Sequence, residues 1–139
     1  LEKTARAAKG LRRLVGRTGR IASSAMVRAR QTARVVSEAM APDGRVEILE
    51  SLAPGAPVRE TVRWLRSIEN GTSVVLVGHE PHLTRLMALL LSPGPEGVQL
   101  SLKKGGFCRI DFAEEVRPGA GSLIYLLTPR ILRRLAPKI

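Results

Sequence analysis

Aromatic side chains are nearly missing from this 139-residue sequence, since its tryptophan, tyrosine and two phenylalanines make up only 3% of it. The core must therefore be aliphatic, and an apolar fraction of 44% can supply it. The shortage also leaves no basic stripe interleaved with aromatics, which is the pattern that stacks on nucleic-acid bases. We therefore expect no nucleic-acid partner.

Cysteine is scarcer still, and the single Cys108 excludes an internal disulfide. A reducing, cytoplasmic location is the prediction, with Cys108 as a small core residue in an alternating apolar run. The apolar run at residues 86–91 is far shorter than the roughly 18 residues that a membrane span requires. No membrane partner and no signal peptide are predicted.

Acidic residues are outnumbered, with 12 against 23 lysines and arginines, and the net charge is +11. Such a balance favours phosphorylated or otherwise anionic partners. The ordinary interpretation is that arginines are distributed along solvated helix faces, and we prefer it to a dedicated nucleic-acid surface. Positive potential would still assist any phosphate site.

The hydrophobic pattern predicts one α/β domain that covers residues 1–139. Val74–Val77 are apolar without alternation, as in a strand of a parallel sheet that is buried on both faces by helices. Alternating runs after residue 97 predict an antiparallel C-terminal portion. Helices are expected at residues 1–15, 25–40, 58–69, 81–91 and from 129, and strands at 19–24, 46–52, 73–77, 98–102, 108–112 and 123–127.

Two features lie where a predicted strand passes into a helix. His79 follows the buried strand, at the edge of the sheet where α/β proteins bind ligands, and the helix start offers backbone N–H groups to an anion. The alternative is a hydrogen-bonded turn histidine. Arg28 lies in the first turn of the helix after Ser23 and Ser24, either of which could cap it. A cation is unfavourable there unless an anion is near, although a solvated surface arginine is the ordinary alternative.

A metal site is a weaker interpretation of the same region. His79 and His82 flank Glu80, but the metalloprotease pattern needs histidines four apart on one helix face. No further cluster of histidine or cysteine completes a ligand set in the sequence. We expect neither a metal nor another cofactor.

Together the two corners resemble the second half of the histidine phosphatase pattern. The sequence Ser-Ala-Met-Val-Arg-Ala-Arg-Gln-Thr at residues 24–32 follows one strand, and Val-Gly-His-Glu-Pro at residues 77–81 ends another. The resemblance is strongest to the SixA-type phosphohistidine phosphatases, which have a phosphoglycerate-mutase-like three-layer fold. It extends over nearly the whole chain, including residues 46–50, 52–55, 103–106 and 127–129.

The resemblance implies a mechanism. Members of the family attack phosphorus with a histidine nitrogen and form a phosphoenzyme, which water then hydrolyses. On that pattern Arg28 binds the phosphoryl oxygens, and His79 is the second active-site histidine that donates hydrogen bonds to them. The implied substrate is a phosphorylated protein or a small phosphorylated compound. No carboxylate stands out as a general acid, because Glu80 is equally suited to the helix start.

The sequence departs from the family in two places. It has no Arg-His-Gly, the family motif that carries the nucleophile at the end of the first strand, and Ala25 stands where the family usually has proline. Residues 1–15 resemble the helix that follows that strand, so we expect the domain to be N-terminally incomplete. The missing strand belongs in the middle of the sheet, and its absence would expose backbone groups beside residues 73–77.

Three hypotheses follow. The first is a phosphatase whose nucleophile is upstream of this chain. The second is a non-catalytic domain that binds phosphate or a phosphoprotein in the same pocket. The third is a basic nucleic-acid-binding protein, whose binding would survive Arg28→Ala and His79→Ala.

Overall fold

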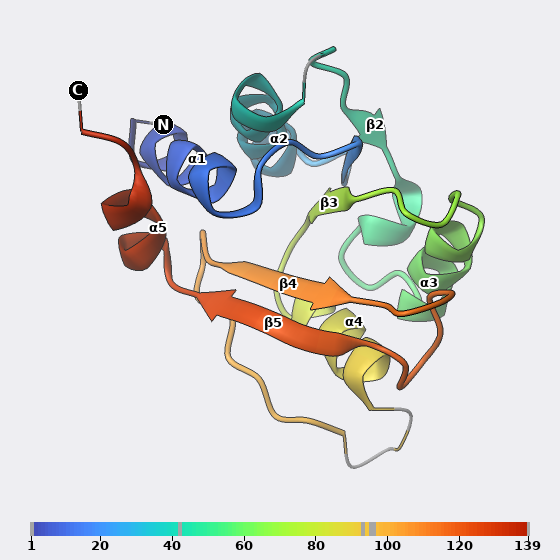
Figure 1. Ribbon diagram of the computed structural model, residues 1–139. Helices are drawn as coiled ribbons and strands as arrows, with labels where there is room; N and C mark the ends of the chain where they lie inside the picture. Colours follow the sequence, from blue (N-terminus) through green and yellow to red (C-terminus); the bar gives the residue numbers. More distant parts are fainter. Residues whose placement is uncertain (1, 42, 93, 95–96, 139) are drawn as a thin grey trace.

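Helices and strands alternate along the first two thirds of the computed structural model, which describes residues 2–41, 43–92, 94 and 97–138 (Figure 1). The predicted α/β class is confirmed, although Leu1 of the first predicted helix lies outside the described residues. The elements are α1 (Glu2–Val15), β1 (Arg20–Ser23), α2 (Val27–Met40), β2 (Glu47–Ile48), the 3-10 helix η1 (Glu50–Leu52), α3 (Val58–Arg66), β3 (Val74–Val77), α4 (His82–Leu91), β4 (Phe107–Asp111), β5 (Ser122–Leu127) and α5 (Pro129–Leu135).

The strands form two sheets of different type. The first is parallel with the order β2-β1-β3, and Ser23 of β1 is paired with Ile48 on one side and with Val77 on the other. The second sheet is the antiparallel pair of β4 and β5, which has an irregularity between Arg109 and Ile110. The parallel sheet followed by an antiparallel portion agrees with the sequence prediction.

Two helical layers cover both sheets. One core joins α1, α2 and α5, and Val75 and Val77 of β3 and Phe107 of β4 pack against it. The other core joins α3 and α4, and Leu76 of β3 and Ile110 of β4 pack against that one. Because β3 and β4 send side chains into the same two cores, the two sheets lie in one layer between the same helices.

The two sheets are nevertheless not hydrogen-bonded to each other. The carbonyls of Ser73 and Val77 accept hydrogen bonds from backbone N–H groups of residues 19, 20 and 24, in β1 or directly beside it. Successive residues of a strand direct their backbone groups to opposite sides, so the N–H and carbonyl groups of Val74 and Leu76 point away from β1. Figure 1 shows β4 on that side of β3. All four β3 residues are only partly buried, which corrects the prediction of a strand buried on both faces; the cause is its position at a sheet edge.

Three predicted elements are wrong in extent or kind. The strand predicted at residues 46–52 is paired over two residues only, because Leu52 N–H bonds the Leu49 carbonyl and begins η1. The helix predicted to reach residue 69 ends at Arg66, where the Ser67 hydroxyl bonds the Trp64 carbonyl. Residues 98–102 form no strand, and β4 pairs with β5 instead.

Helix α5 begins as predicted, with the Thr128 hydroxyl accepting from Ile131 N–H at 3.3 Å. Within the described residues, no helix combines the length and the apolar character needed to cross a membrane.

Candidate active site

The two strand-to-helix corners picked out from the sequence meet at the carboxyl edge of the parallel sheet. Ser24 follows β1 and His79 follows β3, and the parallel pairing of these strands continues as Ser24 N–H donates to the Val77 carbonyl at 3.1 Å. Beyond that bond, Ser24 Oγ lies 2.6 Å from His79 Nε2. A direct hydrogen bond therefore joins residues 55 positions apart in the sequence.

Ser24 is fully buried, and its hydroxyl has a second contact. The N–H of Met26 donates to Ser24 Oγ at 3.3 Å, so the side chain is fixed against both its own turn and His79. Neither serine caps α2, contrary to the prediction, because Ser24 is engaged in this way and Ser23 Oγ donates to the Ser24 carbonyl. The first N–H groups of α2 consequently receive no side-chain acceptor, which suits them to an anion.

Arg28 lies in the first turn of α2 and is exposed. Across the described part of the chain, its guanidinium has no hydrogen bond or ion pair, and it forms no hydrogen bond with His79. The two residues before it, Met26 and Val27, are also exposed, at 52% and 59%. The structure thus places Arg28 next to the Ser24 turn with its side chain in solvent, and it is Ser24 that contacts the imidazole of His79.

The side chain of Glu80 is hydrogen-bonded to the first turn of α4. Its carboxylate accepts a hydrogen bond from Thr84 N–H at 3.0 Å and a second one from the Thr84 hydroxyl. A carboxylate at this position satisfies the free N–H groups of the helix and complements its dipole. The carbonyl of His79 also accepts from Leu83 N–H at 2.8 Å, which holds the turn against the helix.

His82 is buried, with 3% of its surface exposed, and differs in this from the partly buried His79. Burial is the main cause that lowers the pKa of His82. A hydrogen bond to the Ser51 backbone opposes this shift, and the neighbouring Arg85 and His79 lower the pKa further. Its Nε2 is a buried atom without a partner in the part of the chain that the structure describes. Among those residues, no group of three or more histidine, cysteine or acidic side chains could hold a metal ion.

The thiol of Cys108 is not suited to nucleophilic chemistry. Cys108 is half-buried in β4, and burial raises the pKa of its thiol to about 11. A thiol with that pKa is protonated at neutral pH and is a poor nucleophile. The structure therefore supports the prediction that Cys108 has a packing role.

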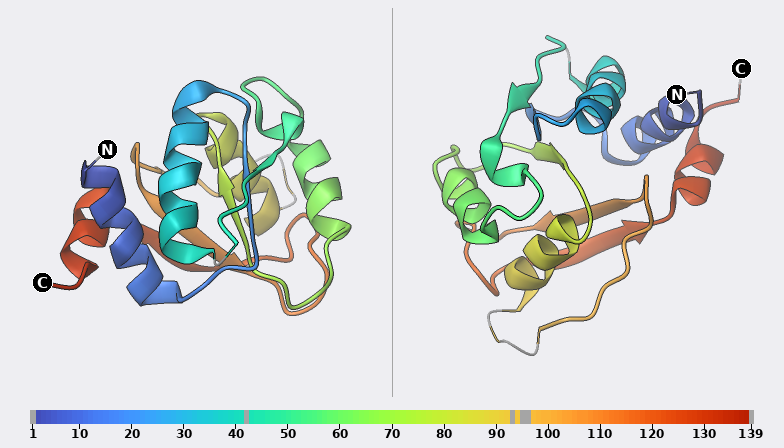
Figure 2. Two further views of the ribbon diagram at one scale, coloured as in Figure 1. Left: turned by 90° about the horizontal axis from the view of Figure 1, so that it is seen from above. Right: turned by 180° about the vertical axis from the view of Figure 1, so that it is seen from behind.

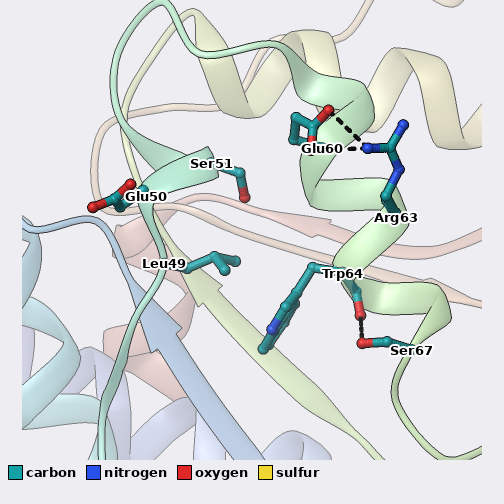
Figure 3. A pocket seen from close by; sticks show the side chains of 7 residues that line it. All are labelled: Leu49, Glu50, Ser51, Glu60, Arg63, Trp64 and Ser67. Atoms are coloured by element: carbon teal, nitrogen blue, oxygen red, sulfur yellow. Dashed lines mark hydrogen bonds and ion pairs between the residues drawn. The ribbon is translucent and has the colours of Figure 1, made fainter.

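A separate hollow of about 410 Å³ lies between η1 and α3 (Figure 3). It does not include Ser24, Arg28 or His79, so this hollow and the candidate site are different places. One wall contains the ion pair between Glu60 and Arg63 at 3.2 Å. The residues that line it are Leu49, Glu50, Ser51, Glu60, Arg63, Trp64 and Ser67.

Sequence reasoning missed the role of one residue. Ser24 is the first residue of the Ser-x-x-x-Arg pattern, but a serine before a helix is most simply expected to be a cap. Only the parallel register of β1 and β3 shows that its hydroxyl reaches the imidazole of His79.

Comparisons with known proteins bear on the fold of the chain. No family model matches the chain. An uncharacterized protein of Picosynechococcus sp. is 31% identical over 112 residues, which are 78% of this chain and 66% of that protein, just under two thirds. The structure of the protein histidine phosphatase SixA complexed with tungstate superposes with a TM-score of 0.78 at 24% identity, over 94% of this chain and 81% of SixA. The chain therefore has the fold of a protein histidine phosphatase, as the motifs at Ser24–Thr32 and Val77–Pro81 led us to expect.

Proposed function

We propose that this chain is the greater part of a phosphatase that hydrolyses phosphohistidine in a protein, or a small phosphoester. The hydrogen bond between Ser24 and His79 is the observation that carries the proposal, because it joins the two motif-bearing corners into one site. The fold shared with SixA supports a hydrolase of this kind. A cytoplasmic location is part of the same proposal.

In this proposal Arg28 and the start of α2 bind the phosphoryl group. The first turn of α2 has no acidic residue and no side-chain cap, so its N–H groups and the Arg28 guanidinium offer donors to one anion. Ser24 orients the imidazole of His79, which donates a hydrogen bond to a phosphoryl oxygen as charge develops. SixA was solved with tungstate, a tetrahedral oxyanion of the same shape as phosphate.

The nucleophile in this proposal is a histidine on a strand upstream of the 139 residues. The facing edges of β3 and β4 support its location, since both strands contact the same two cores without pairing with each other. A strand between them would bond the backbone groups of Val74 and Leu76 and would end beside His79. The nucleophile's nitrogen would form a bond to phosphorus while the bond to the leaving imidazole breaks, and water would then release inorganic phosphate.

A second candidate function follows from the histidine count. The sequence has two histidines, and neither stands in an Arg-His-Gly. With no third histidine supplied, the same site would bind phosphate or a phosphoprotein without hydrolysing it.

The test is a turnover assay of the full-length protein on a phosphohistidine-containing protein and on p-nitrophenyl phosphate. We expect Arg28→Ala and His79→Ala each to lower kcat about 10²–10³-fold, the loss typical when a transition-state donor is removed. Arg30→Ala is the matched control, because Arg30 is exposed on the same helix and has no assigned role in the pattern. Wild-type rates in both site variants would contradict the proposal, and tungstate binding without turnover would favour the second candidate.

A further inference from the structure

The two ends of the chain form one strongly basic unit. Residues 1–19 and 129–139 contain ten of the 23 basic side chains and, apart from Glu2, no acidic one, so they hold nine of the eleven units of net charge. The 109 residues between them are close to balanced. In the sequence these are two separate clusters at opposite ends.

The fold brings the two clusters together, as Figures 1 and 2 show for α1 and α5. Gly10 of α1 lies so close to α5 that a Cβ there would be 1.8 Å from the Leu132 carbonyl oxygen. Arg6 Nε also donates to the Arg133 carbonyl at 3.3 Å. Because the two helices meet through backbone atoms and small residues, most of their basic side chains stay in solvent. The exposed ones are Lys3, Arg6, Lys9, Arg13, Arg17, Arg130, Arg134 and Lys138.

A groove lies at the junction of the two helices. It has a volume of about 410 Å³ and is lined by Arg6, Lys9 and Lys138 with Ala136 and Pro137. Its lining thus holds three cations and no acidic side chain among the described residues. Such a concave, cationic surface concentrates anions and suits a phosphate group.

We infer that this surface, the basic face of α1 and α5, binds the phosphodiester backbone of a double-stranded nucleic acid without sequence preference. Helix α1 has 14 residues and so is about 21 Å long, comparable with about six phosphates of one strand at ~3.4 Å of helix axis each. Seven of the ten cations are arginines, whose planar forks suit phosphate oxygens. The lack of aromatics, from which the sequence predicts no nucleic-acid partner, argues against stacking on single-stranded bases but not against backbone contacts.

Two other anionic partners fit the surface less well. The core of a specific protein interface is enriched in aromatic and apolar anchors, whereas Ile131 is the one large apolar side chain exposed on α1 or α5 in the described part of the chain. A membrane-surface helix inserts its apolar face, but that face of α1 is already buried in the protein through Ala7, Ala8 and Leu11.

The experiment measures binding of a fluorescent duplex of about 20 base pairs to the full chain as a function of salt. We expect a Kd on the order of 10⁻⁵ M near physiological salt, as for sequence-independent binding. The variant Arg6→Gln/Lys9→Gln/Lys138→Gln should weaken binding at least about tenfold and reduce the slope of log K against log salt by about 2 to 3. DNA and RNA duplexes are compared, because the backbone chemistry is shared.

The control variant removes the same charge elsewhere, with Arg45→Gln/Arg59→Gln/Arg85→Gln at exposed positions outside α1 and α5. It should bind the duplex within about twofold of wild type. Equal losses in both variants, or no duplex binding, would overturn the inference. So would a preference for polyglutamate or for phosphatidylserine vesicles over the duplex. The inference does not depend on phosphatase activity, since His79→Ala should bind the duplex like wild type.

Discussion

The junction of α1 with α5 and the junction of β1 with β3 both join segments that are distant in sequence, but they do so by opposite means. At the first, backbone approaches backbone at Gly10 and Leu132, and the charged side chains point outward. At the second, two side chains, Ser24 and His79, turn toward each other. Because α1 and α5 approach through their backbones, their many basic side chains remain in solvent over a wide surface. Because Ser24 and His79 meet through their side chains, the position of one imidazole is fixed. The first arrangement suits an extended anion, and the second suits one tetrahedral group.

The largest effect is expected from a substitution that disrupts the contact between α1 and α5 and leaves the contact between Ser24 and His79 intact. Gly10→Ala places a methyl group against the Leu132 carbonyl, a backbone atom that cannot rotate away, so we expect a loss of about 3 kcal/mol in the free energy of unfolding. Urea denaturation measures it. Gly94→Ala is the control, because no atom of the described residues lies within 4 Å of the position that its new methyl group would take. A Gly10→Ala protein as stable as wild type would mean that α1 and α5 are not in close contact.

An intermediate effect is expected at the edge of β3 that faces away from β1, next to the contact between Ser24 and His79. If a further strand pairs with β3 in the full-length protein, the amides of Val74 and Leu76 will exchange with deuterium at least about tenfold more slowly there than in the 139-residue chain. The Val75 and Val77 amides, which the alternation directs toward β1, serve as internal controls. Equal exchange of Val74 and Leu76 in both forms would mean that no further strand pairs with β3.

The smallest effect is expected from loss of the ion pair between Arg20 of β1 and Glu47 of β2. Arg20 donates to both carboxylate oxygens of Glu47, at 2.7 and 2.5 Å, and this hydrogen bonding is the main cause that lowers the pKa of Glu47. Because both side chains are more than one third exposed, we expect Glu47→Gln to cost only about 0.5–1 kcal/mol at pH 7.

The pH dependence of that cost has a definite sign. A carboxyl with a lowered folded-state pKa stabilises the protein above its unfolded pKa, and this contribution is lost as the pH falls through the folded value. The difference in unfolding free energy between wild type and Glu47→Gln should therefore shrink on acidification below about pH 4. A difference that grows in acid would show that the ion pair is not its source.

The helices can be predicted from the sequence because each buries one periodic face. In α2, Ala29, Ala33, Val36 and Met40 are all buried, as their spacing indicates. The strand prediction at 98–102 is wrong because alternation shows only that a segment could pair, and β5 is the partner that β4 takes. The predicted burial of β3 is wrong for a related reason, since apolar side chains do not reveal whether the neighbouring strand is present.

For the candidate site, the sequence predicts which two strand-to-helix corners meet, but not which of their atoms are in contact. The motifs put Ser24, Arg28 and His79 at one edge of the sheet, and the parallel register brings Ser24 and His79 together. The hydrogen bond of Ser24, the absent cap of α2 and the outward position of Arg28 depend on rotamers and turn geometry, which no spacing in the sequence encodes.

The bonds from Thr84 to the Glu80 carboxylate have a consequence for the range of substrates. The Glu80 carboxylate already accepts two hydrogen bonds from Thr84, so it is engaged at the start of α4 rather than free to serve a departing group. In a phosphatase built on this site, catalysis would favour compounds whose departing atom is stable without protonation by Glu80. Phosphorylated imidazoles and aryl phosphates belong to that set, while simple alkyl phosphates should react far more slowly.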